Sequence, residues 1–139
     1  MKYTITIHPR YQETDQMGII HHSVYPIWYE MGRVGFCEAL GLPFHTIEEK
    51  GLRLAILSVH SEFIKSSRFG EVYQLETKIT ELSKVRMMFT YVIYNSLNEL
   101  IHRGYTEIAW LNVSLRPINL QKQYPDIYAL FSSVIEPQL

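Results

Sequence analysis

A carboxylate, a glycine and two adjacent histidines lie close together near the N-terminus, as Asp15, Gly18, His21 and His22. Apolar and polar residues alternate in the segment before them, so we expect Asp15 to lie in a turn between a strand and the start of a helix. Amides at a helix start favour negative charge and could hold a polarised carbonyl oxygen while Asp15 attacks or activates water. Gly18, which has no Cβ, would let the carbonyl approach the backbone. This arrangement predicts acyl transfer.

Other interpretations of these residues stay open. Asp15 could be an ordinary turn residue whose carboxylate binds a nearby backbone N–H. Glu13 is a rival carboxylate, ranked lower because the turn interrupts the strand alternation that would align it with Asp15. One histidine of the pair could orient substrate or assist proton transfer to a departing thiolate, although adjacent side chains in a regular element point apart. Because no third ligand stands at metal spacing, we expect no metal and no cofactor.

A helix from about Val24 to Leu40 would position this turn. We expect Ser23 to cap its first turn, and Gly41 followed by Pro43 to end it. Its expected apolar stripe is Ile27, Trp28, Met31, Val34, Phe36 or Cys37, and Leu40, with Glu30, Arg33 and Glu38 mostly on the other side. The stripe predicts that the helix packs against a core.

The spacing of these residues is similar to that of a known family. The chain reads Tyr11-x-Glu13-Thr14-Asp15-x-Met17-Gly18-x-x-His21-His22-x-x-Tyr25, then Trp28-Tyr29-Glu30 and Gly32-Arg33. It resembles the hotdog-fold acyl-CoA thioesterases of the 4-hydroxybenzoyl-CoA thioesterase group, and does so more weakly from Phe63 to Gly70 and in the strands that follow. The resemblance implies that Asp15 is the nucleophile or general base and that the backbone amide near His22 polarises the thioester carbonyl. Val24 departs from the pattern, because many relatives have Asn there.

The rest of the chain predicts a sheet. Period-two alternation indicates strands at about 52–64, 72–80, 87–94 and 100–113, in antiparallel succession, in addition to the strand that begins near Tyr3. Short helices are expected at 43–50 and after Pro125, and Gly104 is expected to mark a bulge or bend. The pattern is α+β in one domain of residues 1–139. It matches the hotdog fold that the resemblance implies, with a curved antiparallel sheet of about five strands around one long helix.

Several side chains are candidates for substrate contacts. Four basic residues at strand ends, Lys65, Arg68, Lys84 and Arg86, could bind coenzyme A phosphates, although charges that protect a strand edge would look the same. The acyl group could contact Tyr25, Trp28, Met31, Met87 and Met88, most of which we expect to be plain core. His60 and Cys37 are expected to be buried core residues.

Composition excludes several classes of function. The chain has 139 residues with 13 Lys plus Arg against 14 Asp plus Glu, which gives no electrostatic basis for binding nucleic acid. It contains no apolar run of the roughly 20 residues that span a membrane, and its start is too polar for a signal peptide, so we expect a cytoplasmic protein. A single cysteine excludes an intrachain disulfide.

The combined prediction is a hydrolase that cleaves an acyl-thioester, acyl-CoA before acyl-carrier-protein thioester, to acid and thiol. A non-catalytic acyl-CoA-binding or regulatory hotdog domain is the alternative, and a dehydratase is a third possibility. The resemblance also implies a homodimer joined sheet to sheet, or a homotetramer, with sites between subunits.

Overall fold

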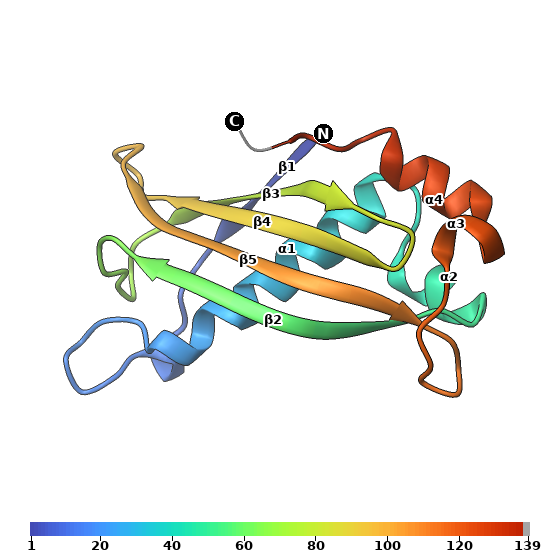
Figure 1. The fold of residues 1–139 in the computed structure, drawn as a ribbon. Helices are drawn as coiled ribbons and strands as arrows, with labels where there is room; N and C mark the ends of the chain where they lie inside the picture. The colour runs from blue at the N-terminus through green and yellow to red at the C-terminus, as the bar shows by residue number, and fades with distance from the viewer. Residues whose placement is uncertain (138–139) are drawn as a thin grey trace.

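The computed structural model describes residues 1–137 and confirms the expected α+β architecture, five strands with one long helix (Figure 1). The strands are β1 (Lys2–Ile7), β2 (Arg53–Phe63), β3 (Tyr73–Leu82), β4 (Arg86–Tyr94) and β5 (Leu100–Leu111). The helices are η1 (Tyr11–Glu13), η2 (His22–Val24), α1 (Tyr25–Ala39), α2 (Phe44–Glu49), α3 (Leu120–Gln123) and α4 (Pro125–Ser132). The short helices η1 and α3 were not expected, because a single turn carries too little apolar periodicity.

The strands form one antiparallel sheet in the order β1-β3-β4-β5-β2. β2 pairs with β5 and not with β3, the strand that follows it in the chain. The segment 64–72 that links β2 to β3 is longer than a hairpin turn, and it carries the chain past the sheet end. β2 and β1 therefore form the two edges of the sheet.

Helix α1 lies along one face of the sheet and buries an aromatic-rich face against it (Figure 1). Trp28, Tyr29 and Phe36 are almost fully buried, as is Cys37, whose pKa is raised to about 12 by burial. Gly32 permits the close approach, because a Cβ there would overlap Oγ1 of Thr77 on β3.

The expected helix faces need correction at three positions. Ile27 and Met31 are exposed, whereas Arg33 is only 5% exposed and donates from Nη1 to the hydroxyl of Tyr91, 3.1 Å away. Apolar residues cover so much of the helix surface that their spacing does not determine which residue faces the sheet most directly. The helix rotates so that Gly32 faces the sheet, which brings Arg33 inward. The predicted end is confirmed, since Gly41 adopts φ +85° and the Leu42 amide bonds back to Cys37.

Gly104 has a different role from the one expected. It sits in regular register between Tyr91 and Ser61, and the bulges lie elsewhere, between Ile56 and Ser58 among other places. A Cβ at Gly104 would overlap the hydroxyl of Tyr29. The glycine therefore makes room for a helix side chain.

Strand β2 is an exposed edge rather than a core strand. Its apolar residues Ile56, Leu57, Val59 and Phe63 are all at least 44% exposed. The prediction that His60 is a core histidine is wrong, since it lies on this edge and stacks on Tyr105.

No helix within residues 1–137 is long and apolar enough to cross a membrane.

Candidate active site

Asp15 lies in a small hairpin that leads into α1. A β-bridge joins Thr14 to Ile20, and the amide of Asp15 donates to the carbonyl of Ile19 at 2.8 Å. Gly18 closes the turn at φ +79°, a conformation that glycine adopts without strain, and the space beside its Cα is open. The hairpin projects beyond the start of α1 at the end of the sheet (Figure 1).

The Asp15 carboxylate is half-buried and oriented by its own turn. Its Oδ1 accepts the Met17 backbone N–H at 2.7 Å, which is the turn-type hydrogen bond considered from the sequence. Within residues 1–137, Oδ2 accepts no hydrogen bond. One oxygen is thus held while the other remains available for chemistry.

The helix start differs from the expected Ser23 cap. The ring nitrogen Nδ1 of His21 accepts the Ser23 amide at 3.1 Å and lies 2.7 Å from the Ser23 hydroxyl. The Ser23 side chain therefore binds His21 and not a helix amide, because Ser23 lies within the single turn of η2 that precedes α1. Val24, the position where the sequence departs from the resemblance, is buried, and its amide bonds to the His21 carbonyl.

His22 is exposed at the first position of η2. Its ring stacks on that of His21 with the centroids 4.2 Å apart, so the two side chains lie together and do not point apart as a regular element would require. Among the hydrogen bonds of the described residues, none uses the His22 backbone N–H. This amide is therefore a free donor at the entry to α1.

The hairpin is anchored on both sides. The Ile20 amide donates to the carbonyl of Ser67 at 2.8 Å, and the Ser67 hydroxyl lies 2.7 Å from that of Tyr25. The His21 amide donates to the carbonyl of Glu13, also at 2.8 Å. Tyr25 and Ser67 are both buried, so they hold the hairpin in place and present no open surface in this chain.

Glu13 is engaged elsewhere. Its carboxylate accepts the Arg10 backbone N–H at 2.6 Å and pairs with the Arg10 guanidinium at 3.5 Å, and the side chain is buried. Unlike Asp15, it is satisfied by a local ion pair. This arrangement supports the lower rank of Glu13.

A buried hydrogen-bond network beneath the start of α1 was not expected from the sequence. His102 on β5 stacks on Tyr25 with centroids 4.2 Å apart, and its Nε2 lies 2.5 Å from the Tyr29 hydroxyl, which also bonds Ser61. Burial lowers the pKa of His102 to about 4, so the ring is neutral. A histidine in a strand gives no sequence signal that separates this buried position from the exposed one of His60.

The four basic candidates fall into two pairs in the single chain. Lys65 and Arg68 follow β2, where Lys65 pairs with Glu99 of the β4–β5 turn. Lys84 and Arg86 lie at the opposite end of the sheet, where Arg86 pairs with Glu107 at 2.6 Å. No group of three His, Cys, Asp or Glu side chains within residues 1–137 could hold a metal ion.

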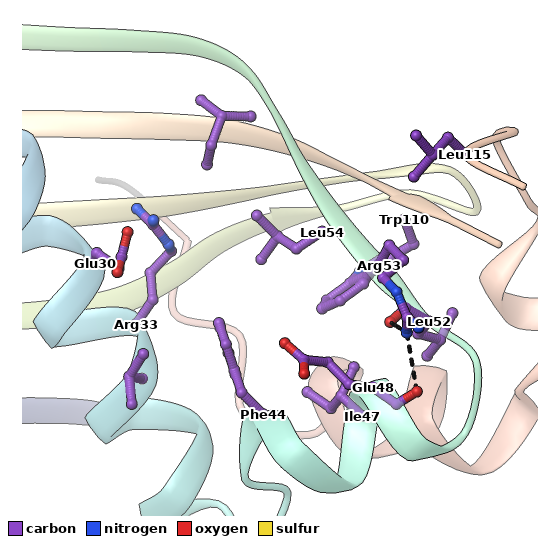
Figure 2. A pocket seen from close by; sticks show the side chains of 12 residues that line it. Glu30, Arg33, Phe44, Ile47, Glu48, Leu52, Arg53, Leu54, Trp110 and Leu115 are labelled. Atoms are coloured by element: carbon purple, nitrogen blue, oxygen red, sulfur yellow. Dashed lines mark hydrogen bonds between the residues drawn. The ribbon is translucent and has the colours of Figure 1, made fainter. Parts of the chain in front are cut away.

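The acyl candidates are mainly structural. Tyr25, Trp28 and Met87 are buried, whereas Met31 is exposed and Met88 is half-buried. A pocket of about 470 Å³ opens instead between α1, α2 and β2, lined in part by Arg33, Phe44 and Leu54 (Figure 2). Sequence spacing did not identify it, because its walls come from α1, α2, β2 and β5, which meet only in the fold.

Comparison with known proteins agrees with this architecture. The family model of the thioesterase-like superfamily matches residues 9–129. A putative acyl-CoA thioesterase of Bacillus subtilis, YneP, is 32% identical over 126 residues, which are 90% of this chain and 91% of that protein.

Solved structures extend the likeness to three dimensions. A DHNA-CoA thioesterase from Staphylococcus aureus superposes with a TM-score of 0.90 at 28% identity, over 95% of this chain and 89% of that one. A hypothetical protein from Thermus thermophilus, TT1821, gives 0.88 at 34% identity, over 98% and 99% of the two chains. The chain therefore belongs to the thioesterase-like superfamily, and it is a hotdog-fold thioester hydrolase.

Proposed function

We propose that this enzyme hydrolyses acyl-CoA to a free acid and coenzyme A, and that Asp15 is its catalytic carboxylate. The observation that carries the proposal is the placement of Asp15, oriented by one oxygen and open at the other, in a hairpin that ends beside the free His22 amide. A base or nucleophile and an oxyanion donor are the two groups that thioester hydrolysis needs. Gly18 leaves open space beside the turn, which the carbonyl could enter.

The reaction follows from these two groups. The thioester carbonyl oxygen accepts the His22 N–H, which stabilises negative charge as the carbonyl carbon becomes tetrahedral. Asp15 either takes a proton from the water that adds to this carbon or adds to it directly, in which case water then cleaves the resulting anhydride. The carbon–sulfur bond breaks and the thiolate leaves. A proton from the exposed His22 ring would assist this departure, although a thiolate leaves without one.

A homodimer joined at β2 completes the proposal. β2 has no strand partner on its outer side within residues 1–137 and exposes a row of apolar side chains, a combination that favours pairing with another strand. A second copy related by a two-fold axis would place the Arg53 end of one β2 beside the Phe63 end of the other. Tyr25 packs on Phe63, so each Asp15 hairpin would lie at the subunit boundary.

The same dimer would bring the basic residues together. The hairpin with Lys84 and Arg86 lies at the Arg53 end of β2, because Arg86 pairs with Ala109 and Ala109 with Ala55. Lys65 and Arg68 follow the Phe63 end. Each site would then have one basic pair from each subunit available for the coenzyme A phosphates.

The experiment is thiol release from a panel of short, long and aromatic acyl-CoAs, with acyl-carrier-protein thioesters as a second panel. We expect turnover of at least one acyl-CoA at a rate well above the spontaneous one. Binding of acyl-CoA without hydrolysis would contradict the proposal and favour the non-catalytic binding domain.

A further inference from the structure

The pocket between α1, α2 and β2 holds a buried charge that the hydrolytic mechanism does not use. Its volume is about 470 Å³, and most of its wall is apolar. The apolar lining includes Val34, Phe44, Ile47, Leu54, Ile56 and Trp110. Figure 2 shows Arg33 reaching into this space from α1, with Phe44 and Leu54 across from it.

The Arg33 guanidinium has no counter-ion among residues 1–137. The residue is 5% exposed, its Nη1 donates to Tyr91, and its buried Nε–H has no hydrogen-bond partner among residues 1–137. No carboxylate of these residues forms an ion pair with it. The acidic residues that line the pocket, Glu30 and Glu48, are both exposed.

Arg53, the other basic residue of the pocket, is only half-buried and binds backbone carbonyls. Its Nη1 donates to the carbonyls of Glu48 and Leu52, each at 2.9 Å (Figure 2). Arg33 differs from Arg53 because the Nε–H that it leaves without a partner among residues 1–137 is buried.

An unpaired buried guanidinium is costly. Arginine stays protonated throughout the physiological pH range, and a buried charge is stabilised only by an opposite charge and good hydrogen bonds. A carboxylate fits the planar donor fork of a guanidinium. A ligand that combines an apolar stem with a terminal carboxylate would match both the walls of this pocket and its unpaired guanidinium.

We propose that this pocket is the acyl-specificity site and that Arg33 selects acyl groups that end in a second carboxylate. The inference rests on the proposed thioesterase function and on the β2-joined dimer. In that dimer the Arg53 end of β2, where the pocket opens, lies next to the partner's Asp15 hairpin. A thioester held there would extend its acyl chain between Leu54 and Ile56 toward Arg33, and a chain that ends in methyl would leave the guanidinium unpaired.

The test compares adipoyl-CoA with hexanoyl-CoA, which differ in whether the chain ends in carboxylate or methyl. We expect the parent enzyme to favour adipoyl-CoA in kcat/KM by about tenfold or more, the range of a hydrogen bond to a charged group. Arg33→Met should abolish this preference, mainly by slowing adipoyl-CoA hydrolysis. Arg53→Met is the matched control and should keep the preference.

A second variant tests the proposal even if Arg33→Met does not fold. Leu54→Glu keeps Arg33 and supplies a fixed carboxylate inside the pocket, so it too should lose the preference. Hydrolysis of both substrates without preference by the parent, or a preference that survives in Arg33→Met, would overturn the assignment.

Failure of the proposed function gives a separate result. If the parent hydrolyses neither thioester, calorimetric titration with free hexanoate and with hexan-1-ol, which has no carboxylate, tests the pocket alone. Binding of hexanoate over hexan-1-ol that Arg33→Met loses would support the role of Arg33, and equal or absent binding of the two compounds would refute it.

Discussion

At the residue scale, the proposed chemistry depends on a backbone group as much as on a side chain. The His22 N–H is a free donor at the first position of η2, and the His22 ring is exposed and stacked on His21. A side-chain substitution alone cannot remove this amide, so the usual alanine variant would miss its contribution. Proline can remove it, because it lacks the N–H and is tolerated at the first helical position.

We predict that His22→Pro lowers kcat by about a hundredfold or more, the usual cost of losing an oxyanion donor, whereas His22→Ala changes kcat by less than about tenfold. The preceding residue, His21, has φ −61° and ψ 141°, an extended conformation that suits a residue before proline. Steady-state kinetics on the best acyl-CoA measures kcat for both variants, with circular dichroism as the folding control. Equal kcat values for the two variants would show that the amide does no catalytic work.

The buried histidine makes stability depend on pH. The pKa of His102 is lowered from 6.5 to about 4 by burial, so the unfolded chain binds a proton more readily than the folded one between these values. The contribution of the neutral His102 ring to the free energy of unfolding is therefore fully present above about pH 6.5. It is lost as the pH falls toward 4. We predict a decrease of up to about 3 kcal/mol in the free energy of unfolding over this window.

Urea denaturation at several pH values measures this decrease, and His102→Phe should reduce the slope while preserving the aromatic stack on Tyr25. A parent stability that is flat between pH 6.5 and 4.5 would contradict the neutral buried state of His102.

At the element scale, α1 decides which residues face the sheet. The sequence predicted the length and ends of this helix well, because apolar spacing and Gly41 are local signals. It did not predict that Arg33 turns inward and Met31 outward. That choice is set by the contact of Gly32 with β3, which joins segments far apart in the chain.

We predict that Gly32→Ala destabilises the fold by about 1–3 kcal/mol, because the added methyl meets Thr77 and the Leu75 side chain, whose Cδ2 would be 2.7 Å away. Gly35→Ala is the matched control on the same helix, where the methyl meets the half-buried ring of Tyr3. We expect a smaller loss there, since an edge ring can move. Thermal unfolding compares the two, and equal losses would argue against a close contact between α1 and β3.

At the scale of the whole molecule, the site depends on pairings that the sequence does not encode locally. The Asp15 turn, Gly18 and the helix start lie within one continuous stretch, so the family resemblance could identify them together. The pairing of β2 with β5 could not be predicted, because alternation identifies a strand but not its neighbour. The same limit hid the buried role of His102 and the pocket around Arg33.

The exposed β2 edge predicts an assembly. We expect the parent to scatter light as a particle of twice the 16.4 kDa chain mass or more. Val59→Lys, which places like charges near the proposed two-fold axis, should shift the mass toward the monomer and reduce activity, because each site lies between subunits. A parent that is monomeric and fully active at micromolar concentration would contradict the shared site.

The most direct measurement of the central claim is the rate of thiol release by Asp15→Asn relative to the parent on the preferred acyl-CoA. Asparagine keeps the shape of Asp15 and can still accept the Met17 amide, so the hairpin should persist while the carboxylate is lost. Asp126→Asn in α4 is the matched control and should leave the rate unchanged. We predict a fall in kcat of about a hundredfold or more for Asp15→Asn with an unchanged melting temperature. A rate within a fewfold of the parent would show that Asp15 only shapes the turn and that the catalytic carboxylate lies elsewhere.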